Sequence, residues 1–160
     1  MKNEKVVSIE KLAGIAHAMA AEGRRLVVTN GCFDLLHVGH VRYLESAREL
    51  GDALAVGLNG DVAVRELKGA DRPLNREQDR AEVIAALACI NYVAVFQEMR
   101  ATRFLETVRP AIYVKGGDYQ LETLDPEERE ALEKVGAEIR IIPFEADYST
   151  SSLIARMHRT

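Results

Sequence analysis

The sequence predicts an α/β protein built on a single, doubly wound, parallel sheet of five strands, with helices on both faces. Short apolar runs alternate along the chain with segments whose apolar residues recur at helical spacing, the pattern of successive strand–helix–strand units. The connections between them are short. Polar and glycine-rich motifs follow several of the apolar runs, where parallel sheets of this kind bind their ligands.

Local signals fix the elements of this Rossmann-like arrangement. Ser8 can cap the first helix and Gly23 can end it, Gly51 ends the second helix, and Asp61 is interpreted as the N-cap of the third. Apolar periodicity places the other elements. The predicted strands are 26–29, 53–58, 92–96, 111–114 and 138–142, and the predicted helices are 8–22, 39–50, 61–67, 77–89, 101–108, 126–135 and 149–157.

Length and composition predict a single domain over residues 1–160, with an N-terminal helix in residues 1–24 packing on it. The net charge of −4 is evenly spread, which argues against a nucleic-acid surface. No apolar run approaches the ~18 residues of a membrane span. The two distant cysteines, Cys32 and Cys89, indicate no disulfide framework and favour a reducing, cytoplasmic setting.

Residues 29–40, Thr-Asn-Gly-Cys-Phe-Asp-Leu-Leu-His-Val-Gly-His, carry the most chemical information. They follow an apolar strand and open into a helix, so the first free N–H groups and the positive end of the helix dipole lie here. Gly39 allows an anion to approach the backbone closely. His37 and His40 can donate to a polyphosphate from one turn, most strongly in the transition state. The pattern predicts a nucleoside triphosphate site.

Two familiar phosphate motifs are missing. The chain has no G-x-x-x-x-G-K-[ST] sequence, and no G-x-G-x-x-G follows the first strand, which excludes P-loop enzymes and ordinary Rossmann dehydrogenases. The two histidines also lack the spacing and further ligand of a zinc site such as HExxH. We therefore expect no metal held by the protein alone.

Residues 31–40 resemble the cytidylyltransferase-like nucleotidyltransferases, whose motif is Gly-x-Phe-Asp-x-x-His-x-Gly-His. The resemblance extends over residues 27–154 and includes segments 67–69, 72–75, 114–119 and 149–151 together with Arg80. Within that family, Lys-Gly-Gly-Asp-Tyr at 115–119 is most similar to adenylyltransferases that make ADP-heptose from heptose 1-phosphate. Glycerol-3-phosphate cytidylyltransferases carry Met-Gly-Asp-Asp-Trp there.

The resemblance implies a role for each matching residue. The groups expected to act on the triphosphate are His37, His40 and Lys68. The groups expected to bind the nucleotide are Gly31, Cys32, Phe33, Gly39, Arg80, Gly116, Gly117, Ser149, Thr150 and Ser151. The groups expected to bind the second substrate are Asp34, Asn59, Arg72, Lys115 and Asp118.

Structural alternatives remain open for several of these residues. Lys68 begins a polar loop, 68–75, that we expect to be mobile, and it is either a phosphate ligand or a solvated lysine. Arg80 near a helix start has either a bound phosphate or the nearby carboxylate of Glu77 or Asp79 as its partner. Asp34 lies near substrate or metal, or only holds the loop through backbone N–H groups. Gly116 and Gly117 either place backbone amides beside the nucleotide or serve turn geometry alone, and Ser149 also suits a helix cap.

The expected reaction is transfer of AMP from ATP to a sugar 1-phosphate, with Mg²⁺ bound mainly through the ATP phosphates. The alternatives are cytidylyl transfer from CTP to glycerol 3-phosphate or a similar alcohol phosphate, and a non-catalytic nucleotide-binding regulator. Retention of His37, His40 and Lys68 argues against the regulator. We also expect a homodimer, no nucleic-acid or membrane partner, and a separate sugar kinase that supplies the 1-phosphate.

Overall fold

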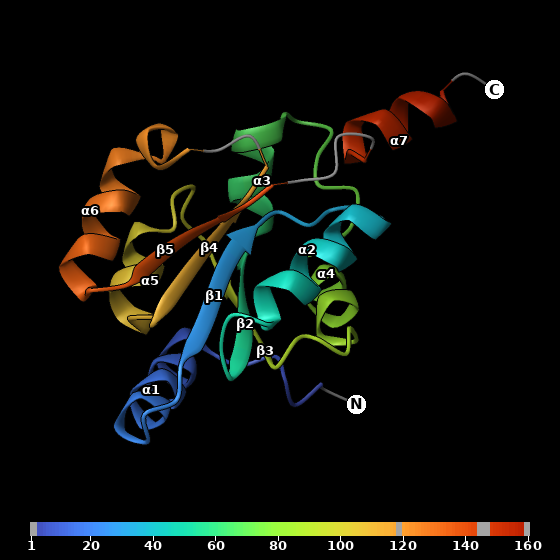
Figure 1. The fold of residues 1–160 in the computed structure, drawn as a ribbon. Helices are drawn as coiled ribbons and strands as arrows, with labels where there is room; N and C mark the ends of the chain where they lie inside the picture. Colours follow the sequence, from blue (N-terminus) through green and yellow to red (C-terminus); the bar gives the residue numbers. More distant parts are fainter. Residues whose placement is uncertain (1–2, 118–119, 144–147, 159–160) are drawn as a thin grey trace.

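A computed structural model describes residues 3–117, 120–143 and 148–158, and its centre is a parallel sheet of five strands (Figure 1). The strand order is β3-β2-β1-β4-β5, so the chain winds first to one side of β1 and then to the other. The predicted doubly wound sheet is confirmed. The strands are β1 Leu26–Gly31, β2 Ala53–Asn59, β3 Tyr92–Phe96, β4 Ile112–Gly116 and β5 Glu138–Ile142.

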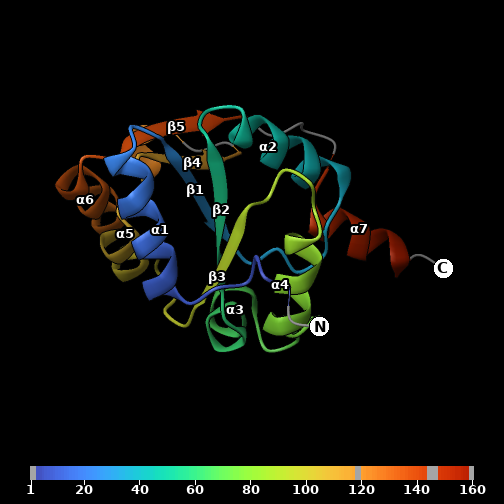
Figure 2. The same ribbon diagram turned by 90° about the horizontal axis from the view of Figure 1, so that it is seen from below.

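Helices cover both faces of the sheet, as Figure 2 shows with α1, α5 and α6 on one side and α2 and α4 on the other. Such layering follows from crossover connections between parallel strands. The helices are α1 Ile9–Ala21, α2 Val38–Arg48, α3 Asp61–Lys68, α4 Glu77–Ala85, α5 Thr102–Val108, α6 Pro126–Val135 and α7 Thr150–Met157, with a 3-10 turn, η1, at Leu121–Thr123.

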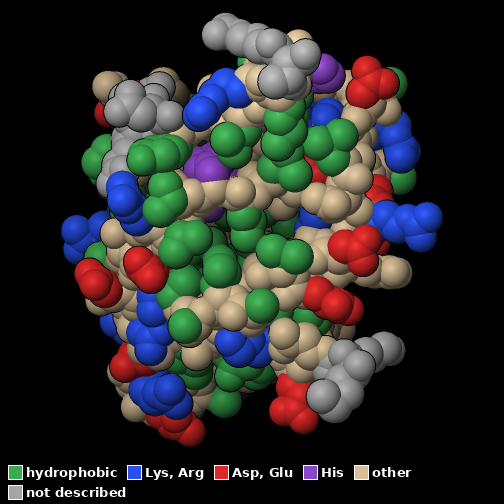
Figure 3. Space-filling view, turned by 90° about the vertical axis from the view of Figure 1, so that its right-hand side faces the viewer, with side chains coloured by type: hydrophobic (Ala, Val, Ile, Leu, Met, Phe, Trp, Pro, Cys, Tyr) green, Lys and Arg blue, Asp and Glu red, His purple; other side chains and the backbone are tan. Residues whose placement is uncertain are grey.

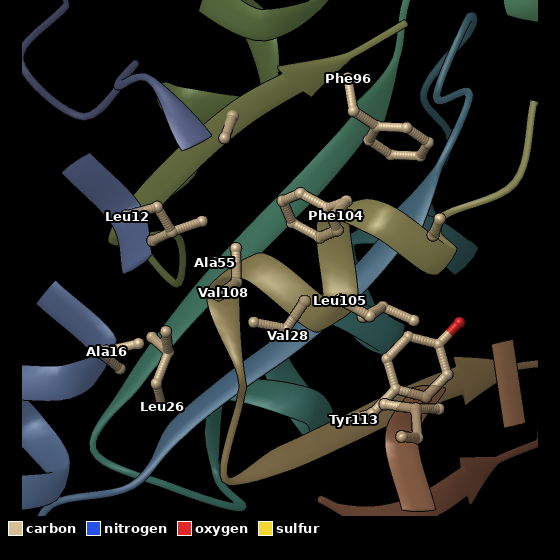
Figure 4. Close-up of a cluster of buried hydrophobic side chains, with 14 of the residues drawn as sticks. Leu12, Ala16, Leu26, Val28, Ala55, Phe96, Phe104, Leu105, Val108 and Tyr113 are labelled. Atoms are coloured by element: carbon tan, nitrogen blue, oxygen red, sulfur yellow. The ribbon is translucent and has the colours of Figure 1, made fainter. Parts of the chain in front are cut away.

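The sheet is hydrophobic on both faces because alternate residues of each strand point to opposite sides. Val28 and Ala55 face the α1–α5–α6 layer, whereas Val27 and Val56 face the α2–α4 layer. Figure 4 shows the first of these clusters, in which Phe104 of α5 packs against the sheet. Gly57 in β2 makes room for that ring, since an added Cβ would lie 2.5 Å from Phe104 Cε1.

Two predicted details were wrong. The fourth helix ends at Ala85 rather than at residue 89, because two short turns follow it and carry Ile90 into the core, where it is 1% exposed. Gly60, not Asp61, is the N-cap of α3. The Asp61 carboxylate instead accepts a hydrogen bond from Arg80. Asp61 is of a residue type that suits an N-cap, and the sequence pattern alone does not reveal that its partner is the distant Arg80.

Helix α1 packs on the sheet through Leu12, Ala16 and Met19, all buried. Ser8 caps it, as predicted, by accepting the Lys11 N–H. Helix α7 differs, since it projects from the body of the molecule and none of its residues is buried (Figure 1). Within the described part of the chain, no helix is both long enough and apolar enough to span a bilayer.

Candidate active site

The two histidines lie together at the N-terminus of α2, above the carboxyl end of β1. His37 is the N-cap residue, with extended backbone, and its N–H donates to Nδ1 of His40 at 3.4 Å. The two rings stack on each other. Gly39 permits this packing, because an added Cβ would lie 3.0 Å from the His37 ring. The first turn of α2 therefore combines two imidazoles with the N-terminal backbone N–H groups of a helix, which suits a phosphate.

Burial lowers the pKa of both imidazoles. The pKa of His40 falls to about 4, chiefly through desolvation and secondly through the neighbouring His37, and burial also lowers the pKa of His37. Both rings are therefore neutral at pH 7. Since Nδ1 of His40 accepts a backbone N–H, its own proton is assigned to Nε2. Nδ1 of His37 is buried and has no hydrogen-bond partner among the described residues.

Phe33 shapes the turn that leads from β1 to these histidines. Its backbone is left-handed, with φ 45°, a conformation that is strained for a bulky residue. The buried ring covers Gly31, where an added Cβ would lie 2.9 Å from Phe33 Cε2. The same ring lies 5.4 Å from that of His40, measured between centroids. Gly31 thus makes room for the Phe33 ring, and that ring packs beside His40.

Tyr43 anchors α2 to the middle of the sheet. Its buried hydroxyl lies 2.7 Å from Thr29 Oγ1 in β1 and donates to the Val114 carbonyl in β4 at 3.2 Å. Burial raises the pKa of this phenol well above its usual range. β1 and β4 are the two strands between which the winding reverses, the usual place for a ligand in such a sheet. Tyr43 lies one turn after His40 and fixes the helix at that place.

Asp34 binds the loop that follows α3. Its carboxylate accepts the backbone N–H groups of Leu74 and Asn75 at 2.9 and 3.0 Å and the Nε–H of Arg72 at 2.6 Å. Burial would raise the pKa of Asp34, but these three donors outweigh it and leave the pKa below its usual value. Of the alternatives open from the sequence, the structure supports the loop-holding role. That Asp34 also contacts substrate stays a prediction.

Arg80 joins four segments from inside the protein. It is 1% exposed, and its guanidinium donates to the carbonyls of Asn75, Cys32 and Asn59 and to the Asp61 carboxylate. Hydrogen bonds of this kind, from a buried charge to four acceptors, are strong. The alternatives from the sequence were a bound phosphate or the neighbouring Glu77 or Asp79 carboxylate, and the structure instead gives Arg80 the Asp61 carboxylate. Contact with nucleotide stays a prediction.

The side chains of Asn59 and Cys32 lie beside this cluster. The Asn59 amide donates to the carbonyls of Glu98 and Met99, so it holds the turn after β3. Burial raises the pKa of the Cys32 thiol, which keeps it protonated at neutral pH. Both residues contribute backbone carbonyls to Arg80, and their predicted substrate and nucleotide contacts stay predictions.

Lys68 is the last residue of α3 and is exposed. Gly69 follows with φ 110°, which turns the chain away from the helix. The loop 68–75 therefore has an exposed first part, 68–71, and a second part, 72–75, that hydrogen-bonds to Asp34 in the loop between β1 and α2. We expected the whole loop to be mobile, but its Arg72–Asn75 half is held by the bonds described above.

The end of β4 provides the glycine pair. Lys115 and Gly116 are half-buried in the strand, and the Gly117 N–H donates to the Ile142 carbonyl at 3.1 Å. Gly117 has φ 95°, which only glycine adopts readily. Asp118, a predicted substrate-binding residue, lies outside the described residues.

The start of α7 meets the histidine loop. Ser149 caps the helix by accepting the N–H of Ser152, as predicted. The Thr150 hydroxyl donates to the Leu35 carbonyl at 3.0 Å and so ties α7 to the loop between β1 and α2. Ser151 is exposed. This helix start therefore lies beside the histidines.

On the face that carries α2, α4 and α7, a histidine side chain sits in a recess bordered by apolar side chains (Figure 3). The Tyr148 ring stacks near His37, with centroids 6.2 Å apart. A cavity of 140 Å³ lies close by, with Phe33, Leu36 and Val83 in its wall. A larger cavity of 300 Å³ lies far from these groups, between α1 and the turns that follow α5 and α6.

Residues 28–157 match the family model described as Cytidylyltransferase-like, which is most of the chain. The chain belongs to the cytidylyltransferase-like family. It is a nucleotidyltransferase, as the sequence predicted. Here the family motif, residues 31–40, forms the connection from β1 to the first turn of α2 and carries His37 and His40. Asp34, Arg80 and Tyr43 hold this connection in place.

Curated relatives are similar over nearly the whole of this cytidylyltransferase-like chain. "Bifunctional protein HldE" of Geobacter sulfurreducens is 48% identical over 153 residues, which is 96% of this chain and 31% of the relative. The protein of the same name from Citrifermentans bemidjiense is 50% identical over 152 residues, 93% of this chain and 31% of the relative. The chain thus spans about a third of the length of these relatives.

Solved structures share the fold. The "lipopolysaccharide core biosynthesis protein" from Thermoplasma volcanium has a TM-score of 0.64 and 27% identity, covering 79% of this chain and 100% of the other. A pantoate-beta-alanine ligase from Francisella tularensis has a TM-score of 0.60 and 11% identity, covering 91% and 68%. At that identity the second likeness shows the fold alone.

Sequence reasoning missed three parts of this cytidylyltransferase-like site. The first is Tyr43, to which the sequence pattern gives no role, although its position one turn after His40 is a signal that could have identified it. The second and third are the backbone carbonyls of Leu35 and Asn75, which accept hydrogen bonds from Thr150 and Arg80. No sequence signal identifies a backbone carbonyl as an acceptor. Among the described residues, no three His, Cys, Asp or Glu side chains lie close enough to share a metal ion.

Proposed function

We propose that this protein transfers AMP from ATP to a sugar 1-phosphate, with a heptose 1-phosphate as acceptor, and releases pyrophosphate. The observation that carries the proposal is the pair of neutral, stacked imidazoles of His37 and His40 on the first turn of α2. Neutral N–H donors at a helix N-terminus bind a polyphosphate and strengthen their hydrogen bonds as charge moves onto the leaving group.

In the proposed reaction, a phosphate oxygen of the acceptor attacks the α-phosphorus of ATP in line. The new P–O bond forms as the bond from the α-phosphorus to the bridging oxygen breaks, and the electron pair leaves with pyrophosphate. The nucleophile is already an anion, so neither a general base nor a covalent enzyme intermediate is required. Positioning and charge stabilisation supply the catalysis.

Each candidate residue has a place in this proposal. His37, His40 and Lys68 hold the triphosphate and stabilise the departing pyrophosphate. Gly116, Gly117 and the start of α7 hold the nucleoside and the α-phosphate. ATP enters as its Mg²⁺ complex, a substrate whose ion is retained by phosphate oxygens and water. Asp34 and Asp61 are already committed to Arg72 and Arg80, which favours an ion carried by the nucleotide.

The choice of acceptor and base rests on sequence similarity. The segment 114–119 resembles the ADP-heptose enzymes, and relatives named HldE are 48 and 50% identical. A sugar kinase, separate from this domain, would then supply the 1-phosphate, and a homodimer is the proposed assembly. The second candidate is cytidylyl transfer to glycerol 3-phosphate, which the family description Cytidylyltransferase-like favours.

Pyrophosphate release distinguishes the two candidates. ATP and CTP are each supplied, with Mg²⁺, together with heptose 1-phosphate or glycerol 3-phosphate. We expect turnover with ATP and the heptose 1-phosphate. Turnover with CTP and glycerol 3-phosphate alone would establish the second candidate. The variant His40→Ala is the control for contaminating activity and must abolish most of the signal in either case.

A further inference from the structure

Asn30, the last residue but one of β1, has a side-chain amide that is held through its oxygen alone. Asn30 Oδ1 accepts the hydroxyl proton of Tyr113 in β4, with 2.6 Å between the two oxygens. Tyr113 is fully buried, and Figure 4 shows its hydroxyl pointing away from Leu26, the first residue of β1. This bond orients the amide, so Nδ2 points away from Tyr113. Nδ2 has no hydrogen-bond partner in the described part of the chain, and Asn30 is partly exposed.

The neighbouring residues Thr29 and Asn30 point to opposite faces of the sheet. Thr29 Oγ1 lies 2.7 Å from the hydroxyl of Tyr43 in α2, the helix whose first turn carries the histidines. Tyr113, the partner of Asn30, belongs to the hydrophobic cluster on the α1–α5–α6 side. Successive side chains of a strand alternate in this way. The carboxyl end of β1 therefore has the histidine pair on one side and the Asn30 amide on the other.

The proposed reaction needs different groups on these two sides. In an in-line displacement, the attacking oxygen approaches the α-phosphorus from the side opposite to the departing pyrophosphate. His37 and His40 hold the pyrophosphate in that proposal, and they lie on the α2 side of β1. The acceptor then approaches from the side on which Asn30 lies. β1 and β4 are also the strands between which the winding reverses, where sheets of this kind bind their ligands.

We infer that Asn30 donates a hydrogen bond through Nδ2 to an oxygen of the acceptor, and that Tyr113 is the positioning residue that orients this amide. The inference rests on the proposed function. In both candidate reactions the acceptor is a phosphate monoester that carries hydroxyl groups, so every atom that it offers to an N–H donor is an oxygen. An amide that is already oriented loses little side-chain freedom when the acceptor binds.

A structural alternative is that Asn30 only gives the buried Tyr113 hydroxyl a partner. Asn30→Asp separates the two roles, because the carboxylate still accepts from Tyr113 but has no N–H to donate. Tyr113→Phe keeps the amide and removes the group that orients it. The matched control is Asn91→Asp, at a half-buried asparagine before β3, near the opposite end of the sheet. Asn91 Oδ1 likewise accepts a hydrogen bond, from the Leu54 N–H.

Steady-state kinetics with acceptor and ATP varied separately give the first measurement, after thermal unfolding has shown that each variant is folded. We expect Asn30→Asp to raise the acceptor KM roughly 10- to 100-fold and Tyr113→Phe to raise it less, with the KM for ATP nearly unchanged, and Asn91→Asp to change neither. In the Asn30→Asp background, Tyr113→Phe should add nothing, because its effect passes through the amide. An unchanged acceptor KM in Asn30→Asp, or an equal effect of Tyr113→Phe in both backgrounds, would overturn the inference.

A binding measurement separates this inference from the proposed function. In the NMR spectrum of nitrogen-labelled protein, the side-chain NH₂ signals of Asn30 are assigned by their loss in Asn30→Asp. With a non-hydrolysable ATP analogue bound, we expect heptose 1-phosphate, or glycerol 3-phosphate if that is the acceptor, to shift these signals, whereas the analogue alone leaves them nearly in place. If neither phosphate supports pyrophosphate release, the proposed function fails, and the shift still decides the role of Asn30. Signals that neither phosphate moves would exclude that role.

Discussion

The imidazoles of His37 and His40 lie in stacked contact, with ring centroids 3.9 Å apart and 29° between the ring planes. Two positive charges at this separation would repel each other, and burial adds to the cost of charging either ring. The pair therefore offers neutral N–H donors to a substrate that is itself highly charged. A pair of this kind can gain strength during the reaction, because its hydrogen bonds respond to charge that develops on the leaving group.

Replacing His40 with Ala is expected to lower kcat by about 10²–10³ and to change the KM for ATP much less. The reason is that the lost hydrogen bond acts mainly in the transition state. Steady-state kinetics with ATP varied provides the measurement. His17→Ala, in an exposed position on α1, serves as the matched control and should behave as wild type. A near-normal kcat for His40→Ala would exclude this electrostatic role.

Acidification should destabilise the protein through His40. Its pKa is 6.5 when unperturbed and about 4 in the folded protein, so between these values the unfolded chain binds more protons. Stability contributed by the neutral ring is complete above pH 6.5 and is lost as the pH falls toward 4, by an amount on the order of 2–3 kcal/mol.

Urea unfolding at several pH values tests this dependence. Carboxylates also weaken the protein in acid, since the pKa of Asp34 is lowered in the folded state. The informative quantity is therefore the difference between wild type and His40→Phe. The difference in unfolding free energy should change between pH 6.5 and pH 4.5, and parallel curves would contradict the assignment to His40.

Tyr43→Phe removes one hydroxyl and should reduce both stability and turnover. Thr29 and the Val114 carbonyl each lose a buried partner, at a cost of about 1–3 kcal/mol. The start of α2 also loses its link to β1 and β4, which should lower kcat. Tyr92→Phe, at a half-buried position in β3, makes the same chemical change away from the site. Equal losses in both variants would count against a special role for Tyr43.

Nucleotide binding should protect one half of the loop after α3. Residues 69–71 are exposed, so we expect their amides to exchange rapidly without ligand and more slowly with a non-hydrolysable ATP analogue. The amides of Leu74 and Asn75 donate to Asp34 and should be protected in both states. Hydrogen exchange read by mass spectrometry resolves the two halves. Unchanged exchange at 69–71 would leave Lys68 as a solvated lysine.

Removing Arg80 should unfold or strongly destabilise the protein. Arg80→Met leaves three carbonyls and the Asp61 carboxylate without a buried partner, and breaking such a pair costs about 3–5 kcal/mol. Asp61→Asn should cost less, because Asp61 is partly exposed and its side chain can turn to water. Chemical denaturation of both variants gives the comparison, and a milder effect for Arg80→Met than for Asp61→Asn would contradict the role of Arg80 in joining these four segments.

The order of elements could be predicted because each apolar run and each helical stripe is a local pattern. Strands 92–96 and 138–142 have the predicted bounds. The errors arose where a distant partner decides the outcome. Asp61 suits a helix cap by its type, but Arg80 lies nineteen positions away in sequence and takes its carboxylate. The end of α4 was misplaced because Ile90 reaches the core through turns that continue the helical spacing.

The sequence predicts which residue types form the candidate site more fully than it predicts the hydrogen bonds that hold them in position. A histidine pair beside a glycine can be found in a sequence, since residue types and spacing carry that information. The hydrogen bonds that hold the histidine pair in place cannot be found in a sequence. Backbone carbonyls, such as that of Cys32, accept a hydrogen bond from Arg80 whatever side chain the residue carries. For the same reason the composition of the loop after α3 predicts a uniformly mobile segment, because nothing in it reveals that the Asn75 N–H donates to the Asp34 carboxylate.

Arg80 gathers the ends of β1 and β2, the loop before α4 and the start of α3 around one guanidinium. A designer who transplanted residues 29–40 into another strand–helix junction would carry over the imidazoles without the scaffold that orients them. The smallest portable unit is discontinuous and includes a residue forty positions beyond the motif. A sequence that retains both histidines but has an apolar residue in place of Arg80 should therefore not be counted as an equivalent site.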